Sequence, residues 1–298
     1  MNCANRISRL QFCRRQAKHS WAARSALLSV LFFLNIRAPE AFATKLQTAT
    51  VQAWDRYVGW VDERVQRELS DTRAFLVEDF FPPQEKDAVK RQLEAGEVAV
   101  KRMSAPMPQG EKFVVRDGEI HHWWGAVLVP GVQLPALLRF LQDYDHHAGK
   151  FEDVERSRLI TRDGNFYRFF FRLKRSKAFV TAIFNTEQEC LYTVHSATRE
   201  SSRSAATRIA EVDDPGKPSE REKPPGDDRG LMWRLVSWWR FEQTTRGVVV
   251  EVESASLSRD IPTIIKLIPG VSAYIRSTPK ESLESILRTI RNYGQSLK

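Results

Sequence analysis

Apolar and polar side chains alternate along two neighbouring stretches between Gly230 and Leu257, and this alternation predicts a long antiparallel hairpin. On the first arm, one face carries Trp233, Leu235, Ser237, Trp239 and Phe241. On the second arm, the corresponding charge-free face carries Val248, Val250, Val252 and Ser254. Each arm therefore has one face without charge, and a sheet that turns this face inward needs another element to cover it.

The expected cover is a helix at the end of the chain. Thr278, Pro279 and Glu281 match a capping box with proline at the first helical position. Apolar residues then recur at helical spacing as Leu283, Ile286, Leu287, Ile290 and Tyr293, until Gly294 ends the run. These patterns predict an α+β fold in which a curved antiparallel sheet grips a long C-terminal helix.

Further alternating stretches predict the remainder of the sheet. The expected strands are Gly118–Val129, Val154–Ile160, Phe166–Lys174, Ala178–Phe184, Cys190–His195 and Ala205–Val212, and a helix of about three turns opens near Pro135 after the first strand. On the third of these strands, Tyr167, Phe169 and Phe171 share one face. The sheet is therefore expected to have about seven strands.

The region from residue 44 to residue 116 is interpreted as an N-terminal helical extension of the main domain, which spans residues 117–298. The extension contains an amphipathic helix from Gln47 to Leu69, followed by expected elements at Phe75–Phe80 (strand), Glu85–Ala95 (helix) and Glu97–Met103 (strand). Within the main domain, residues 213–229 hold four prolines and ten charged residues without a large apolar side chain. This composition predicts a mobile, solvated loop.

The charge distribution argues against a nucleic-acid partner. The formal net charge is +9, but residues 1–43 hold seven basic side chains and one acidic side chain. Residues 44–298 therefore hold 39 basic and 36 acidic groups, a net charge of +3. This region lacks the excess of basic residues that binding to a phosphate backbone requires.

The first 43 residues have the pattern of an export signal. A basic leader precedes the apolar core Ala26–Ile36, and Ala41-Phe42-Ala43 fits the cleavage pattern of a signal peptide. Eleven helical residues rise about 16 Å, roughly half of the hydrocarbon thickness of a bilayer, so a spanning anchor fits less well. We expect a mature chain that begins at Thr44 and is periplasmic or secreted. The alternatives are an uncleaved interfacial helix and a misplaced start codon.

Few residues suggest catalysis or metal binding. The sequence contains no phosphate-binding glycine loop, nucleophile elbow, Cys-x-x-Cys pair or His-Glu-x-x-His motif. A metal site would need His121 or His122 together with residues from 143–147, and local hydrogen bonding is the preferred interpretation of these side chains. Cys190 is expected to be a buried, inert thiol. No catalytic residue, metal ligand or cofactor is predicted.

Two further patterns leave alternatives open. Glu251 and Glu253 share a strand face, and we expect surface ion pairs with Arg234 or Arg240 on the neighbouring strand. The apolar stretch Ile261–Ile275 is interpreted as a short packed helix and turn. The alternatives are a movable flap over the mouth of a cavity and a patch that contacts a membrane transiently. The many aromatic residues fit either a solid core or a small-molecule cavity.

The order of these elements resembles the START-like superfamily, also called SRPBCC or helix-grip proteins, over roughly residues 117–297. The stretches that carry the resemblance are Trp123 to Tyr144, GNFYRFFFRL, RSAATRIAEVDD, DDRGLMWRLVSWWRFE, ESASLSRDIP and the helix after Thr278-Pro279. The resemblance implies a hydrophobic cavity between the sheet and the long helix. Members include lipid, sterol and quinone carriers, hormone receptors and polyketide cyclases.

We therefore expect an exported protein that binds a hydrophobic, lipid- or quinone-like small molecule. The expected lining of the cavity consists of Tyr167, Phe169, Phe171, Trp233, Leu235, Ser237, Trp239, Phe241, Leu283, Ile286 and Ile290. The alternatives are an enzyme of the cyclase or isomerase type that uses the same cavity, and a solid-cored interaction module of the cell envelope.

Overall fold

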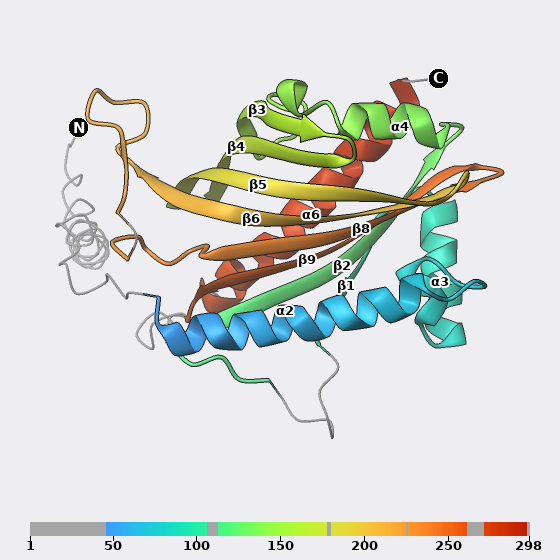
Figure 1. The fold of residues 1–298 in the computed structure, drawn as a ribbon, viewed down its shortest axis with the longest axis horizontal. Coiled ribbons are helices and arrows are strands. Elements are labelled where there is room, and N and C mark those ends of the chain that lie inside the picture. The colour runs from blue at the N-terminus through green and yellow to red at the C-terminus, as the bar shows by residue number, and fades with distance from the viewer. Residues whose placement is uncertain (1–45, 106–112, 178–179, 225, 261–270, 297–298) are drawn as a thin grey trace, which may run out of the picture. The chain divides into compact units, whose positions relative to one another are not determined.

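The structure is a computed structural model that describes residues 46–105, 113–177, 180–224, 226–260 and 271–296 (Figure 1). All of these residues belong to one compact unit, which begins at Thr44. The expected export signal and residues 261–270 of the apolar stretch lie outside the described residues.

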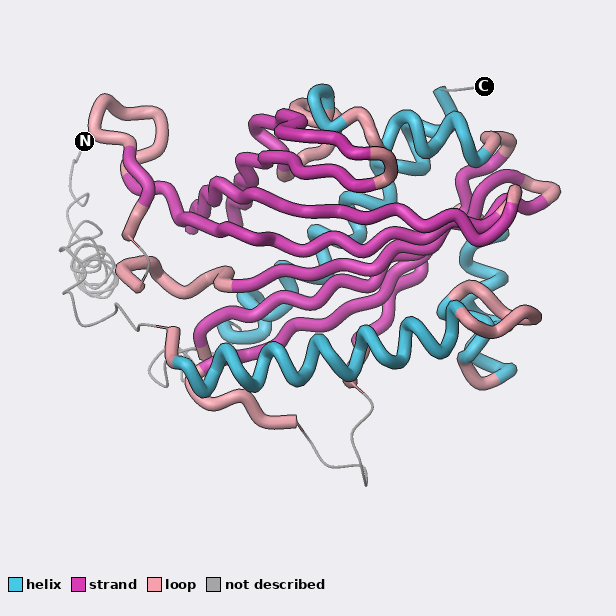
Figure 2. Tube along the Cα trace, in the orientation of Figure 1, coloured by secondary structure: helices cyan, strands magenta, loops and turns pink. Residues whose placement is uncertain are grey.

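One antiparallel sheet of nine strands dominates the fold (Figure 2). Its strands are β1 (Ala99–Arg102), β2 (Gly118–Pro130), β3 (Val154–Asp163), β4 (Phe166–Lys177), β5 (Val180–Ser196), β6 (Arg199–Asp213), β7 (Arg221–Glu222), β8 (Arg234–Thr244) and β9 (Gly247–Arg259). The strand order is β1-β2-β9-β8-β6-β5-β4-β3, and β7 pairs with β6. The sheet has more strands than expected because β1 from the N-terminal extension pairs with β2 and because residues 213–229 contribute β7.

The helices cover both faces of this sheet. They are α2 (Thr48–Leu69), η2 (Val77–Phe80), α3 (Pro83–Glu94), α4 (Leu134–Leu141), η4 (Tyr144–His146) and α6 (Val271–Ser296), where η marks a 3-10 helix. In Figure 1, α2 lies in front of the sheet and α6 lies behind it. The expected helix-grip fold with an N-terminal helical extension is thereby confirmed.

Three local expectations are wrong. Residues 75–80 are not a strand, because the side chain of Asp79 accepts backbone hydrogen bonds from Phe75 and Leu76, both at 3.0 Å, and stabilises η2. The strands expected at 178–184 and 190–195 form the single strand β5, because inward and outward side chains continue to alternate through the polar residues between them. Finally, α6 begins at Val271 and continues through Pro279, which removes one backbone donor without ending the helix.

The inner face of the sheet packs on α6 and α4. This core joins Val127, Val250 and Phe241 of the sheet to Leu287 and Ile290 of α6. Gly125 on β2 allows the close approach of α6, since a side chain there would place its Cβ 2.7 Å from Leu287 Cδ1. This part of the sheet, α4 and α6 therefore form a solid core.

The outer face carries two smaller clusters. Trp54, Tyr57 and Val61 of α2 pack on Val236 and Trp238 of β8. The second cluster lies beneath η2 and α3 and consists of Phe75, Leu76, Val77, Val89, Leu93, Ala99, Trp124, Ala126, Leu128 and Val249. The amphipathic helix expected at 47–69 therefore covers the outer face, as α2.

Candidate functional site

Cross-strand pairing arranges small polar side chains in a row across the inner face. Ser204 on β6 pairs with Ser237 on β8, and Ser237 pairs with Ser254 on β9. At the two ends of the row, Ser204 also pairs with Cys190 on β5 and Ser254 with Trp123 on β2. We call Ser204, Ser237 and Ser254 the hydroxyl row. It crosses a face that is otherwise largely apolar or aromatic.

Aromatic and aliphatic side chains fill much of the grip. Phe169 stacks on Tyr144 with ring centroids 3.9 Å apart, and Phe140 stacks on Tyr293 of α6 at 3.8 Å. The Tyr144 and Tyr192 hydroxyl oxygens lie 3.1 Å apart. Among the expected lining residues, those buried in this packed part are Tyr167, Phe169, Phe241, Leu283 and Ile290. These side chains form core.

The other expected lining residues are less completely covered. Phe171, Leu235, Ser237, Trp239 and Ile286 are half-buried. Trp239 and Ser237 lie next to each other, and the indole Nε1 of Trp239 donates a hydrogen bond to Ser237 Oγ at 3.1 Å. The inner face is therefore less completely covered around Ser237 and Trp239 than in the packed part.

Trp233 does not join this set. It precedes the first residue of β8, and its side chain packs in the outer cluster beneath α2. Its indole Nε1 donates to Asp228 Oδ1 at 2.9 Å. Strand alternation placed Trp233 on the inner face, and that assignment is wrong because the regular strand begins one residue later.

Several inner polar groups hydrogen bond to one another. Ser204 donates to Gln188 Oε1 at 3.3 Å, Gln188 donates to Thr186 Oγ1 at 3.2 Å, and Thr186 donates to the carbonyl of Phe171 at 3.1 Å. Ser237 differs, because it accepts from Trp239 and its own O–H has no acceptor in the described part of the chain. Ser237 is therefore the member of the hydroxyl row best placed to donate to a ligand.

Burial keeps the titratable groups of the packed part uncharged. It raises the pKa of the Cys190 thiol to about 11 and raises the pKa values of Tyr144 and Tyr192 well above their usual range. It lowers the pKa of His147 to about 4. Cys190 is buried, as expected, and its protonated thiol is a poor nucleophile.

The remaining histidines lie where local bonding explains them. His121 and His122 point to opposite faces of β2, and His121 Nε2 lies 3.0 Å from Ser258 Oγ. His146 Nδ1 contacts Asp143 Oδ1 at 2.6 Å, and His147 Nε2 contacts the carbonyl of Phe140 at 3.2 Å. Within the described ranges, no cluster of three or more His, Cys, Asp and Glu side chains is placed to hold a metal.

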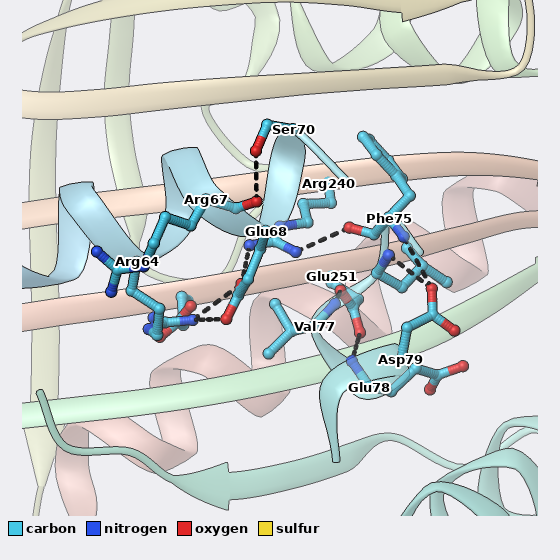
Figure 3. Close-up of polar contacts among 12 residues, drawn as sticks. Arg64, Arg67, Glu68, Ser70, Phe75, Val77, Glu78, Asp79, Arg240 and Glu251 are labelled. Atoms are coloured by element: carbon cyan, nitrogen blue, oxygen red, sulfur yellow. Dashed lines mark hydrogen bonds and ion pairs between the residues drawn. The ribbon is translucent and has the colours of Figure 1, made fainter. Parts of the chain in front are cut away.

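A charged network on the outer face is the main feature that the sequence pattern missed (Figure 3). Glu251 and Glu253 are each 1% exposed, so the expected surface ion pairs are wrong. The backbone N–H groups of Val77 and Glu78 donate to Glu251 at 2.6 and 3.1 Å. Arg240 lies opposite Glu251 on β8. The segment that contains η2 therefore rests on a buried carboxyl group.

Helix α2 is fixed to the sheet by the same network. Arg240 donates to the carbonyl of Phe75 at 2.8 Å and forms an ion pair with Glu68 of α2. Arg64 forms ion pairs with Glu68 and Glu253, and His122 Nε2 lies 2.9 Å from Glu253 Oε1. The network joins the N-terminal extension to the outer face and lies on the side of the sheet opposite to the hydroxyl row.

Among known proteins, the chain is similar to solved structures but not to any family model or curated sequence. No protein-family model matches the chain, and no curated protein sequence matches it. The solved structures that resemble the chain include START-related proteins, at low identity. A STAR-related lipid transfer protein from Xanthomonas axonopodis is 14% identical with a TM-score of 0.41, over 60% of this chain and 94% of that one.

Two other solved structures show the same level of likeness. Human STARD10 is 13% identical with a TM-score of 0.40, over 76% of this chain and 85% of that one. The di-domain ARO/CYC StfQ of the steffimycin biosynthetic pathway is 14% identical with a TM-score of 0.39, over 59% of this chain. The match spans 51% of StfQ. No ligand or activity is carried over from any of them.

Among the described residues, none of the helices is long and apolar enough to cross a membrane.

Proposed function

We propose that the protein binds a hydrophobic small molecule that carries one uncharged polar group, and that the ligand lies on the inner face beside the hydroxyl row. The observation that carries this proposal is that Ser237 and its inner-face neighbours on β8, Leu235 and Trp239, are only half-buried, which leaves apolar surface incompletely covered. A bound hydrocarbon would remove this surface from water, which is favourable by roughly 25 cal/mol per Å².

The chemistry of the hydroxyl row supports an uncharged polar group. A hydroxyl, ester or quinone carbonyl can accept a hydrogen bond from Ser237, which gains on the order of 1 kcal/mol. Ser204, Ser237 and Ser254 carry no positive charge, so an ionised carboxylate or phosphate beside them would lose its hydration without gaining an ion pair. A neutral head group therefore fits the row better than an anionic one.

Titration of the purified full chain tests this proposal. The ligands are a long-chain alcohol, a quinone and a fatty acid, and the readouts are tryptophan quenching and thermal shift. We expect saturable binding of the neutral compounds and weaker binding of the ionised fatty acid. Ser237→Ala should weaken binding about fivefold, the equivalent of one hydrogen bond.

Ser176→Ala is the matched control, because this exposed serine contacts Thr181 at the far end of β4. It should leave the affinity unchanged. If no compound saturates, the interaction-module alternative becomes the better account of the fold.

We also propose that the chain is exported and that cleavage follows Ala43. The basic leader, the short apolar core and the Ala41-Phe42-Ala43 pattern support this. Sequencing the N-terminus of the protein from its producing cell should give Thr44 as the first residue. Retention of Trp21 in that protein would contradict it. Transient membrane contact through Ile261–Ile275 also stays a proposal.

A further inference from the structure

The hydrogen bonds on the inner face form a chain whose direction is fixed at one end by a backbone carbonyl. The carbonyl oxygen of Phe171 can only accept, so the hydroxyl of Thr186, 3.1 Å away, must donate its single hydrogen there. Thr186 therefore accepts from Gln188 at 3.2 Å, which turns the amide nitrogen of Gln188 toward Thr186. The amide oxygen of Gln188 then faces Ser204, and the Ser204 hydroxyl must donate to it, at 3.3 Å. Ser204 is left with lone pairs and without a hydrogen to donate.

The hydrogen bond at Ser237 leaves this hydroxyl in the opposite state. The indole N–H of Trp239 can only donate, so the Ser237 hydroxyl accepts from it, at 3.1 Å. Trp239 also stacks on Phe241, with ring centroids 6.1 Å apart and an angle of 9° between the ring planes. Because Phe241 is 1% exposed, this stack fixes the indole along β8. Ser237 therefore accepts from Trp239 and keeps its own hydrogen for another group.

Ser204 and Ser237 lie directly opposite each other on neighbouring strands. The Cβ atoms of such a pair are about 4.5 to 5.5 Å apart. In the described part of the chain, no hydrogen bond joins the two hydroxyls. Ser204 is 6% exposed and Ser237 is half-buried, so Ser237 is the more accessible of the two. A ligand group that accepts from Ser237 therefore lies next to the lone pairs of Ser204.

We propose that the pair of Ser204 and Ser237 selects a ligand hydroxyl over a carbonyl or ether oxygen. This inference rests on the proposed function, because it identifies the polar group of the same ligand. The oxygen of the ligand hydroxyl accepts from Ser237, and its hydrogen is donated to Ser204. A carbonyl or ether oxygen can make only the first of these bonds. The second bond should favour an alcohol about fivefold, the equivalent of one hydrogen bond.

Two matched ligands test the inference with the full-length protein. Affinities for a long-chain primary alcohol and for the methyl ketone of the same chain length are measured by tryptophan quenching. The ratio of the two affinities is compared between proteins, because the difference in hydration between the ligands is the same for every variant. Ser204→Ala should lower this ratio about fivefold and leave the affinity for the ketone unchanged.

Gln188→Leu tests the direction of the chain while Ser204 stays in place. Without the amide oxygen, the Ser204 hydroxyl can donate to the ketone. The ratio should fall because the ketone binds more tightly. A loss of packing alone would weaken both ligands together and leave the ratio unchanged, and that result would contradict the inference. This variant decides the question if Ser204→Ala shows no cooperative thermal transition.

Ser254→Ala is the matched control, since Ser254 lies opposite Ser237 on the other neighbouring strand, β9. It should keep the native ratio. If Ser254→Ala lowers the ratio and Ser204→Ala does not, the ligand donates to Ser254 and the inference is wrong. If every variant keeps the native ratio, the pair does not select a hydroxyl and the inference is wrong, while the proposed function stands. If neither ligand binds saturably to any of the proteins, both are overturned.

Discussion

At the scale of single residues, the two glutamates of β9 have opposite protonation behaviour although both are buried. Burial raises the pKa of Glu251 to about 8, with Arg240 opposing and Glu78 adding to the rise. Burial also acts to raise the pKa of Glu253. The hydrogen bond and charge of His122 and the charge of Arg64 outweigh this effect and lower the pKa to about 2. The difference lies in their partners on the outer face.

A raised carboxyl pKa makes the folded state less stable at high pH. The pKa of Glu78 is also raised, to about 7, mainly by burial. The folded protein holds these two protons more tightly than the unfolded chain does, so the free energy of unfolding falls as pH rises through about 7 and about 8. Below the ordinary glutamate pKa of 4.5, this contribution to stability is fully present.

Replacing Glu251 with glutamine should flatten this pH dependence. Glu251→Gln removes the ionisation while retaining an oxygen that accepts one of the two backbone N–H bonds of η2. We expect the loss of stability between about pH 6 and about pH 9, measured by urea unfolding, to become smaller than in the native protein. Glu63→Gln, at an exposed position of α2, should keep the native loss. If the loss is unchanged in Glu251→Gln, Glu251 of the native protein must be ionised over this whole pH range.

Glu253 should behave in the opposite way. Its pKa lies below 4.5, so its contribution to stability is present above that pH and is lost as pH falls toward about 2. Glu253→Gln should cost about 3 to 5 kcal/mol near neutral pH, because it leaves the buried Arg64 without its partner on the sheet. Urea unfolding at neutral and acidic pH measures both effects. A cost below about 1 kcal/mol would indicate a solvated pair.

For single residues, the sequence predicts the face of the sheet on which a side chain lies better than it predicts the burial of that side chain. Strand alternation placed Leu235, Ser237, Trp239 and Phe241 on the inner face, and they do lie on that face. It also placed Glu251 on the outer face, which is equally true. Its burial was missed because η2 and α2, which cover it, come from a distant part of the chain.

At the scale of elements, periodic segments were predicted well and their ends less well. The hairpin of β8 and β9 and the helix α2 follow directly from their patterns. The early start of α6 was missed because Thr278 and Pro279 form a local start signal, whereas packing against the sheet lets the helix continue through it. Gly294, expected to end the helix, lies within it.

Gly294 has a packing role that a substitution can test. A Cβ there would lie 2.1 Å from Val129 Cγ1 on β2. Gly294→Ala should therefore lower the free energy of unfolding by about 1 to 3 kcal/mol through overpacking. Gly59→Ala in α2 is the contrast, because its Cβ meets nothing within 4 Å and helix propensity alone should add up to about 1 kcal/mol. Urea unfolding compares the two, and equal effects would show that the contact with Val129 relaxes freely.

At the scale of the whole molecule, one sheet carries two separate layers. Helices α6 and α4 pack on its inner face, and α2, η2 and α3 of the N-terminal extension pack on its outer face. The grip follows from elements that the pattern identified, and its packed part could not be told from a cavity by composition because both use aromatic side chains. The point at which β6 and β8 stop pairing, after Ala205 and Val236, is recorded by no local pattern. The N-terminal extension supplies the cover of the outer face through Arg64, Glu68 and η2.

The segment 213–229 connects β6 to β8 and should be the first place where a protease cuts. Residues 215–221 are exposed, although β7 and the two hydrogen bonds between Arg172 and Glu220, at 2.8 and 2.9 Å, hold part of the segment to the sheet. A cut there costs little, because loop closure depends only weakly on length.

We expect a protease of broad specificity to cut within 213–219 while the thermal unfolding transition is retained. Glu220→Ala should accelerate the cut, because it removes the bonds to Arg172. Glu63→Ala on α2 serves as the control and should leave the rate unchanged. Mass spectrometry of the first fragments locates the cut, and a first cut within β4 or β5 would show that this segment is held more firmly than the sheet itself.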